Sequence, residues 1–311
     1  MTMFKNFKRI KPWEVALTLV VMTLPLVPAN PIAGYGSLVR HAHAAETTKK
    51  LDTTRLVSIG GDVTEIIYAL GEEKRLIARD STSLYPKEAA KLPDVGYMRA
   101  LSPEGILAVN PSAIIAVEGS GPPEALAVLH NASLPFETVP QTYDRDGILK
   151  KIEVVGGLLG VPEKTKALED KVAADLDAAI VDAAKRPEVE RKRVLFVLSN
   201  QNGKILASGT DTAADGIIKL SGALNAITGF TGYKSLTDEA IIEAKPDVIL
   251  IMDREGPLSM SNEDLLKQPA ISLTPAASHK AVIRMDGLHL LGFGPRTASA
   301  IRELNAAIYG G

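Results

Sequence analysis

Tyr97 and Arg99 stand two residues apart in the stretch Gly96-Tyr97-Met98-Arg99, directly before a predicted helix. A phenolate is a hard anionic ligand that suits ferric iron, and tyrosine is one of the side chains that hold haem iron. Because free tyrosine has a pKa of about 10, the iron and a cation such as Arg99 would have to favour the phenolate at neutral pH. On spacing alone, a Tyr97 hydroxyl packed at the edge of a lobe is the simpler interpretation.

Motifs of catalysis are absent from the sequence. It contains no H-E-x-x-H, no nucleophile elbow and no visible Ser-His-Asp arrangement. It has no cysteine, which excludes disulfides, thiolate metal sites and a cysteine nucleophile. Beyond residue 44 the histidines are His130, His279 and His289, and their spacing fits no local zinc pattern. These observations favour a binding protein, with a secreted α/β hydrolase or redox enzyme as the alternative from another class.

A cap-helix-strand unit occurs twice in the sequence. Ser102 and Pro103 predict a helix start, and Pro111 its end. The apolar run at residues 113–117 then predicts a strand covered on both faces. From Leu236 onward a second copy of this unit aligns with the first without gaps. The repeat predicts two similar lobes with this unit at the same place in each.

The strands and helices on either side of one long helix predict the fold class. Apolar runs that alternate with helices indicate α/β lobes with mainly parallel sheets. Residues 162–185 form an amphipathic pattern rich in Ala, Glu and Lys, typical of a helix that joins two lobes. The alternative is a surface helix of a single domain. We place the N-terminal lobe at residues 45–143, the linker with the long helix at 144–190 and the C-terminal lobe at 191–311.

Two loops within the lobes also carry predictions. Gly60 and Gly61 lie between a predicted strand and a predicted helix, where backbone N–H groups can bind a phosphate or carboxylate. The sequence lacks both G-x-G-x-x-G and a P-loop, so a tight strand-to-helix turn is the better interpretation. In the second lobe, the polar stretch at residues 199–204 is interpreted as a loop.

Residues 1–44 are predicted to be a secretory signal peptide. Four basic residues up to Lys11 precede the apolar run 15–27, and a small-x-small cleavage site ends at Ala44. The alternative is an uncleaved membrane anchor, but this run of about 13 residues is short of the roughly 20 that a spanning helix needs. No later run is apolar enough to span a membrane, so we expect a mature protein that is not embedded in one. Without a cysteine for a lipid anchor, we expect it free in the periplasm.

Four segments resemble the bacterial periplasmic haemin-binding proteins that supply haem ABC importers. They are residues 55–61, 96–107, 209–218 and 233–236, and the resemblance extends over essentially the whole chain after the signal peptide. It implies a class III periplasmic binding protein fold, in which two α/β lobes joined by one long helix hold a ligand between them with little hinge motion. It also implies no catalysis. The formal net charge of −2 gives no reason to expect nucleic acid.

The resemblance also implies roles for individual residues. The tyrosine of the Gly-Tyr-x-Arg motif is the axial ligand of ferric haem in that family, which here is Tyr97. Arg99 would contact the haem edge or the propionates, and Tyr233 is a further candidate for such a contact. Arg254, in the loop after the second repeat strand, is the candidate for the distal side or the tyrosine oxygen, and for a contact with the haem edge or the propionates.

The transported ligand implied by this resemblance is ferric haem b. Cobalamin or a ferric siderophore in the same fold is the alternative, although the Gly-Tyr-x-Arg motif argues against it. Some members of the family bind a second haem with a histidine on the second lobe. This sequence has no histidine between His130 and His279, so we expect one haem.

Glu104 and Glu239 occupy equivalent places in the two repeat copies. In the superfamily that the sequence resembles, such glutamates dock onto arginines of the two permease subunits. The resemblance therefore implies an ABC transporter permease dimer as the partner, whose twofold symmetry matches the repeat. The alternative is that each is only a first-turn glutamate stabilised by the helix dipole.

Overall fold

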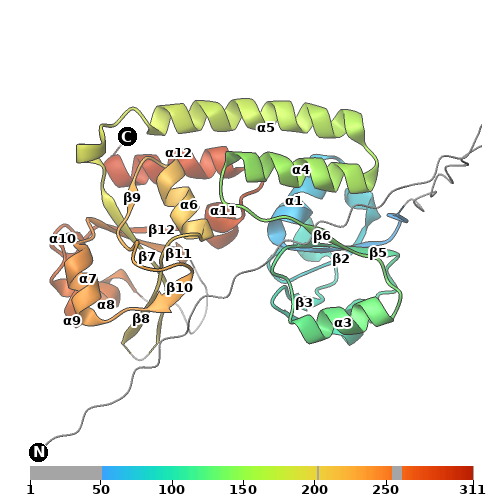
Figure 1. Ribbon diagram of the computed structural model, residues 1–311, viewed down its shortest axis with the longest axis horizontal. Helices are drawn as coiled ribbons and strands as arrows, with labels where there is room; N and C mark the ends of the chain where they lie inside the picture. Colours follow the sequence, from blue (N-terminus) through green and yellow to red (C-terminus); the bar gives the residue numbers. More distant parts are fainter. Residues whose placement is uncertain (1–50, 202, 254–260, 311) are drawn as a thin grey trace, which may run out of the picture. The chain divides into compact units, whose positions relative to one another are not determined.

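The computed structural model describes residues 51–201, 203–253 and 261–310, and their strands form two main sheets (Figure 1). The predicted signal peptide lies outside these ranges. The first sheet has the strand order β2-β1-β5-β6, and all its neighbours are parallel. Its strands are β1 (Leu56–Ile59), β2 (Leu76–Arg79), β5 (Ala113–Val117) and β6 (Phe136–Val139).

Helices cover both faces of this first sheet. Successive residues of a strand point to opposite faces, so neighbouring residues pack against different helices. Ile115 packs in one apolar cluster with α1 and α4, and its neighbour Ile114 packs in a separate cluster with α2 and α3. Every residue of β1 and β5 is buried, which explains their strongly apolar sequences. The helices are α1 (Gly61–Ala69), α2 (Pro103–Ala108), α3 (Pro123–Asn131) and α4 (Arg145–Leu159).

The second sheet has the order β10-β8-β7-β11-β12, with the short β9 paired to β7. The pairs of β7 with β9 and β11, and of β11 with β12, are parallel, whereas β8 is antiparallel to both of its neighbours. The strands are β7 (Arg193–Gln201), β8 (Lys204–Ser208), β9 (Leu224–Asn225), β10 (Tyr233–Ser235), β11 (Val248–Asp253) and β12 (Val282–Asp286).

The prediction of a polar loop at residues 199–204 is wrong. The strand β7 continues to Gln201, which pairs with Lys204 at the start of β8. The sequence Asn-Gly at 202–203 is a typical signal for a two-residue hairpin connection. Ser199 and Asn200 are half-buried polar residues within a paired strand, so polarity alone did not mark a loop.

The second sheet is also covered on both faces. Its Ile249 packs with α7 to α10, which gather in one part of Figure 1, and its Leu250 packs with α6, α11 and α12. These helices are α6 (Ala213–Leu220), α7 (Asp238–Ala244), α8 (Asn262–Leu266), α9 (Pro269–Ser272), α10 (Pro275–Ser278), α11 (Gly287–Leu291) and α12 (Thr297–Tyr309). Short 3-10 turns lie at Glu73–Arg75, Ala89–Lys91 and Glu188–Glu190.

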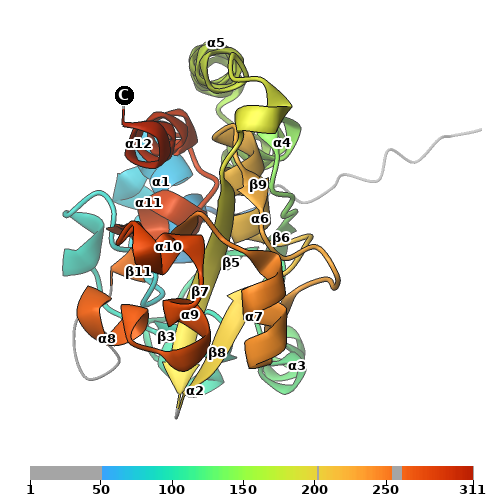
Figure 2. The same ribbon diagram turned by 90° about the vertical axis from the view of Figure 1, so that its left-hand side faces the viewer.

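The long helix α5 (Pro162–Ala183) packs against α4 beside the first sheet and against α12 beside the second. Figure 2 shows α5 end-on, with α4 and α12 next to it. The predicted α/β fold of two lobes with mainly parallel sheets and one long helix is confirmed. The boundaries at residues 143 and 190 stay a prediction, and α4, within the predicted linker, packs on α1 of the first lobe. In the described ranges no helix combines the length and apolarity needed to cross a membrane.

The two lobes meet at the first turns of α1. Lys151, fully buried on α4, donates from Nζ to Asp62 and to the carbonyl oxygen of Gly292, the latter at 3.3 Å. One helical turn further along, buried Glu65 accepts hydrogen bonds from Arg296. Two buried carboxylates of the first lobe are thus neutralised by one cation from α4 and one from the second lobe.

Candidate functional site

Tyr97 lies on a tight hairpin between the first sheet and α2. The strands β3 (Gly96–Tyr97) and β4 (Ala100–Leu101) pair antiparallel, and Met98 and Arg99 form the turn between them. The side chain of Tyr97 is 46% exposed, and Arg99 is exposed too. Gly96 has a φ of +101°, a conformation that L side chains rarely adopt, so this position requires glycine.

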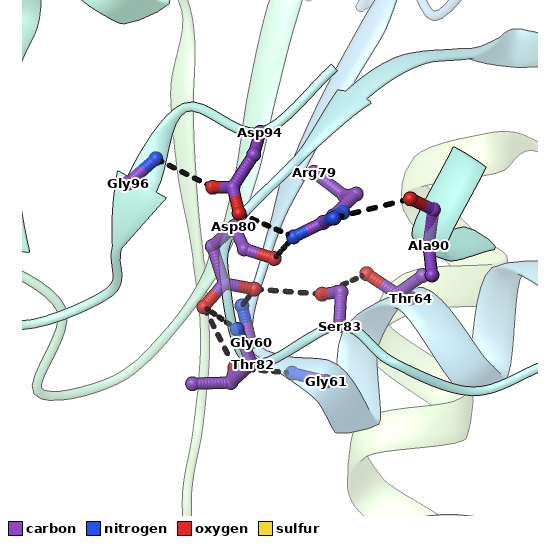
Figure 3. A network of polar contacts seen from close by, with 10 residues as sticks. All are labelled: Gly60, Gly61, Thr64, Arg79, Asp80, Thr82, Ser83, Ala90, Asp94 and Gly96. Atoms are coloured by element: carbon purple, nitrogen blue, oxygen red, sulfur yellow. Dashed lines mark hydrogen bonds and ion pairs between the residues drawn. The ribbon is translucent and has the colours of Figure 1, made fainter. Parts of the chain in front are cut away.

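The base of this hairpin is held by a buried arginine (Figure 3). Arg79, at the end of β2, donates from Nη1 to Asp94 Oδ2 at 2.7 Å, and Gly96 N donates to Asp94 Oδ1 at 2.8 Å. The same Nη1 donates to the carbonyl oxygen of Asp80 at 3.0 Å. On the other side of the hairpin, Gly121 N donates to the Met98 oxygen at 2.9 Å. These hydrogen bonds hold the backbone of the hairpin that carries Tyr97.

Asp80 extends this network to the start of α1 (Figure 3). Its Oδ1 accepts from Gly60 N at 3.0 Å and from Ser83 Oγ at 2.6 Å, and its Oδ2 accepts from Thr82 Oγ1 at 2.7 Å. Gly61 N donates to Thr82 Oγ1 at 3.2 Å. The backbone donors of the two glycines are thus used within the protein, as expected for a tight strand-to-helix turn rather than for an anion site.

The positive charge of Arg99 acts on two tyrosines outside the hairpin. Tyr233, partly buried on β10, packs its ring on Phe196 with centroids 6.3 Å apart. Tyr143, just before α4, packs on Phe293 with centroids 5.4 Å apart. Burial raises the pKa of both tyrosines, and the positive charge of Arg99 partly offsets the increase at each of them. The side chains of Tyr143 and Tyr233 thus lie within the electrostatic reach of Arg99.

Sequence reasoning missed Tyr143. Its only sequence signal is an aromatic residue directly before Asp144, which caps α4 by accepting from Gly147 N at 2.7 Å. That signal is weak, because many helices begin after an aromatic residue. Arg254, the candidate for the distal side, lies outside the described residues, so its role stays a prediction.

Glu104 and Glu239 are exposed at equivalent positions of two short helices. Hydrogen bonding to their own backbone N–H, followed by the Ser102 hydroxyl for Glu104 and the Thr237 hydroxyl for Glu239, lowers the pKa of both carboxyls. Each helix therefore begins with an ionised, solvent-facing carboxylate. The structure places the two acids at equivalent positions of α2 and α7.

The three histidines within the described residues all take part in ordinary protein contacts. His130 stacks on Phe136 with ring centroids 5.7 Å apart, and His289 lies 3.2 Å from a carboxylate oxygen of Glu303. His279 Nδ1 is 2.9 Å from the carbonyl oxygen of Pro275. Within residues 51–201, 203–253 and 261–310, no group of three or more His, Cys, Asp or Glu side chains could hold a metal ion.

A family model described as "Periplasmic binding protein" matches residues 56–287. The chain belongs to the periplasmic binding protein family. This family consists of substrate-binding transport proteins, so the protein is a substrate-binding component of an ABC importer, acts in the periplasm and is not an enzyme.

Two solved structures of periplasmic haem-binding proteins are similar to this one. BhuT, in complex with two haems, is 38% identical with a TM-score of 0.77, and the match covers 82% of this chain and 97% of that one. RhuT from Roseiflexus sp. RS-1, in apo form, is 37% identical with a TM-score of 0.78, and the match covers 83% and 98%. The predicted resemblance to the haemin-binding proteins of class III is confirmed.

Curated relatives are more distant and more varied. The ABC transporter substrate-binding lipoprotein YvrC of Bacillus subtilis is 27% identical over 266 residues, which cover 85% of this chain and 82% of that protein. A vitamin B12-binding protein of Pectobacterium atrosepticum is 25% identical over 260 residues, which cover 81% and 90%.

Proposed function

We propose that the protein binds ferric haem through Tyr97 and delivers it to the permease dimer of an ABC importer. The observation that carries this proposal is the exposed Tyr97 on a braced hairpin, with the exposed Arg99 in the turn of the same hairpin. The haem-binding proteins BhuT and RhuT, similar over nearly their whole lengths, support haem as the ligand.

The three tyrosines differ in what they can offer a ferric ion. Burial raises the pKa of Tyr143 and of Tyr233, which favours their neutral, protonated form. A neutral phenol is a poor ligand for ferric iron, but it can donate a hydrogen bond to a propionate or lie against the porphyrin. The solvent-facing Tyr97 is accessible to the iron, which would displace the phenol proton on binding, and Arg99, two residues away, would stabilise the resulting negative charge or pair with a propionate.

The experiment that tests this is an absorption titration of the purified exported protein with ferric haem. We expect a saturable ferric high-spin spectrum in the wild type and its loss in Tyr97→Phe. Tyr85→Phe is the matched control, because Tyr85 is 42% exposed and also lies in the first lobe. An unchanged haem spectrum in Tyr97→Phe would contradict the proposal.

Stoichiometry is tested by the same titration. BhuT was solved with two haems, whereas we propose one for this protein. Saturation at one equivalent supports this proposal. Saturation at two equivalents would contradict it. That result would show that a second haem can bind although the segment between His130 and His279 contains no histidine.

Cobalamin is the second candidate ligand, because vitamin B12-binding proteins are among the relatives. A cobalt corrinoid brings its own axial ligands and needs no tyrosinate from the protein. Cobalamin that binds tightly in the wild type and equally well in Tyr97→Phe, with no specific haem binding, would favour this candidate. Competition between the two ligands would show that they share one site.

We assign docking on the two permease subunits to Glu104 and Glu239, one in each lobe. Their equivalent positions and their ionised side chains support contacts with two equivalent cationic groups of a twofold partner. Glu104→Gln and Glu239→Gln should each weaken binding to the importer while the haem spectrum stays unchanged. Equal importer binding by the double variant would contradict this assignment.

The route of the protein to the periplasm is proposed as well. The relative from B. subtilis is a lipoprotein by name, whereas this sequence contains no cysteine to carry a lipid. We therefore propose cleavage before Ala45 and release without a lipid anchor. Sequencing the N-terminus of protein from the periplasmic fraction tests both, and recovery in the membrane fraction would contradict the release.

A further inference from the structure

Two exposed aliphatic side chains occupy equivalent positions in the two lobes. Leu107 on α2 is 39% exposed, and Ile242 on α7 is 37% exposed. Leu107 lies three residues after Glu104, and Ile242 lies three residues after Glu239. Because residues three apart share one face of a helix, each of these faces presents a carboxylate beside an aliphatic side chain.

Core packing does not require either of these side chains. The residue before each one, Ile106 or Ile241, already anchors its helix, being 0% and 1% exposed. Single exposed aliphatic residues are common on proteins and need no explanation alone. Here the same aliphatic position is exposed in both copies of the repeat, next to the same acid, which calls for a shared cause.

The two helices also have the same setting in their lobes. Ser102 Oγ accepts from Gly105 N at 3.2 Å, and Thr237 Oγ1 accepts from Ala240 N at 3.2 Å, so both helices start with the same cap. The strands that follow, β5 and β11, pair in parallel with β1 and β7.

Their position relative to the long helix is also the same. The helix α5 belongs to the apolar cluster that covers one face of each sheet, whereas α2 and α7 pack in the clusters on the opposite faces. A twofold partner can therefore meet both helices through the same kind of contact.

We propose that Leu107 and Ile242 form, with the adjacent glutamates, a two-part docking surface for the permease dimer of the importer. Each subunit of that partner would offer a cationic side chain beside an apolar recess that receives one aliphatic side chain. This inference rests on the docking role proposed for Glu104 and Glu239. It adds that the acids orient the encounter and that the aliphatic side chains supply affinity.

The physical basis is the different behaviour of the two contact types. Exposed charge pairs steer and orient association, but they add little net affinity and are screened by salt. Burial of an aliphatic side chain removes apolar surface from water and is much less sensitive to salt. Salt dependence therefore separates the two contributions in one experiment.

The test measures binding of the haem-loaded full-length mature protein to its importer, reconstituted in lipid nanodiscs, at low and high ionic strength. Leu107→Ser and Ile242→Ser should each weaken binding about fivefold at both ionic strengths. If the sites act independently, the double variant should bind about 25-fold more weakly. Glu104→Gln and Glu239→Gln should instead weaken binding mainly at low ionic strength.

Controls separate docking from folding and from cargo binding. Val181→Ser is the matched control, because Val181 is an aliphatic residue on α5 that is 65% exposed. It should bind the importer like the wild type. Leu107→Ile and Ile242→Leu should keep affinity, and all variants should keep the wild-type haem spectrum and melting temperature.

Two outcomes would overturn the inference and are distinguishable from each other. If the double serine variant binds normally while the glutamine variants bind weakly, docking rests on the acids alone. If neither pair of variants affects binding, the docking role of Glu104 and Glu239 fails as well. A loss confined to one lobe would also contradict the inference, because it requires equivalent contacts on both subunits.

Discussion

Arg296 of the second lobe holds Glu65 of the first lobe through three hydrogen bonds. The Arg296 backbone N donates to Oε1 at 3.0 Å, and its Nε and Nη2 donate to Oε2 at 3.0 and 2.9 Å. The guanidinium also lies 3.5 Å from the ring centroid of Tyr85. Burial raises the pKa of Glu65, and the contacts with Arg296 oppose that increase. The pair joins two segments that are 231 residues apart in sequence.

Arg296→Met should strongly destabilise the protein, by about 3 kcal/mol, because Glu65 would be left buried without its cation. Urea unfolding measures this free energy. Arg302→Met is the control, since Arg302 and Asp175 form an exposed pair whose loss should cost less than about 1 kcal/mol. Equal free energies of unfolding for the two variants would contradict the role assigned to Arg296.

Lys151 offers a test of the buried ion pair between α4 and α1. Lys151→Met leaves Asp62 buried and unpaired, which should also cost about 3 kcal/mol in the free energy of unfolding. Adding Asp62→Leu should recover much of that loss, because two apolar side chains replace a buried ion pair. Strictly additive losses in the double-mutant cycle would show that the two residues do not act as a pair.

Asp94 should position Tyr97 and also neutralise the buried Arg79. Asp94→Ala removes the acceptor of both Arg79 and the Gly96 N–H, so the hairpin should loosen. We expect haem affinity to fall about 10-fold, as is typical for partners that orient an iron ligand. Thermal unfolding should also shift to a lower temperature, because the buried Arg79 guanidinium loses its carboxylate partner, so haem affinity is measured well below that transition.

Glu88→Ala is the comparison for Asp94→Ala, because it removes another exposed carboxylate from the same stretch of chain. It should leave haem affinity unchanged. Equal haem affinity of the wild type and Asp94→Ala would show that the hairpin needs no brace.

Two of the partly buried tyrosines, Tyr143 and Tyr233, predict late ionisation at alkaline pH. Burial raises the pKa of Tyr143 and of Tyr233 in the folded state. The stability that these buried neutral phenols contribute is therefore fully present below the pKa of an unfolded tyrosine, about 10. It is lost as the pH rises through their raised pKa in the folded protein. Ultraviolet titration should show phenols that ionise later than free tyrosine.

Variants assign those late phenols to residues. Tyr143→Phe and Tyr233→Phe should each remove part of the late-ionising fraction. In the control Tyr85→Phe, whose tyrosine is 42% exposed, that fraction should persist. A titration in which neither of the first two variants changes the late fraction would contradict the burial argument.

Local sequence determined the elements and their caps. Ser102 and Thr237 each start a helix because the hydroxyl accepts from a backbone N–H three residues on, an interaction that needs no tertiary contact. The buried strands were predictable because a strand covered on both faces needs an apolar run. The repeat could be seen in the sequence because two equivalent helices and strands need similar caps and similar apolar runs.

Only the tertiary structure decided which distant side chains meet. Lys151 and Asp62 are 89 residues apart, and nothing in their neighbourhoods marks a lysine as buried or an aspartate as its partner. The packing of Tyr143 on Phe293 likewise forms only in the folded chain, because the two residues are far apart in the sequence. Caps and strands follow from interactions within a few residues, whereas these pairs form only when separately folded elements pack together. The sequence could thus indicate Tyr97 and its motif, but not the contacts that hold it in place.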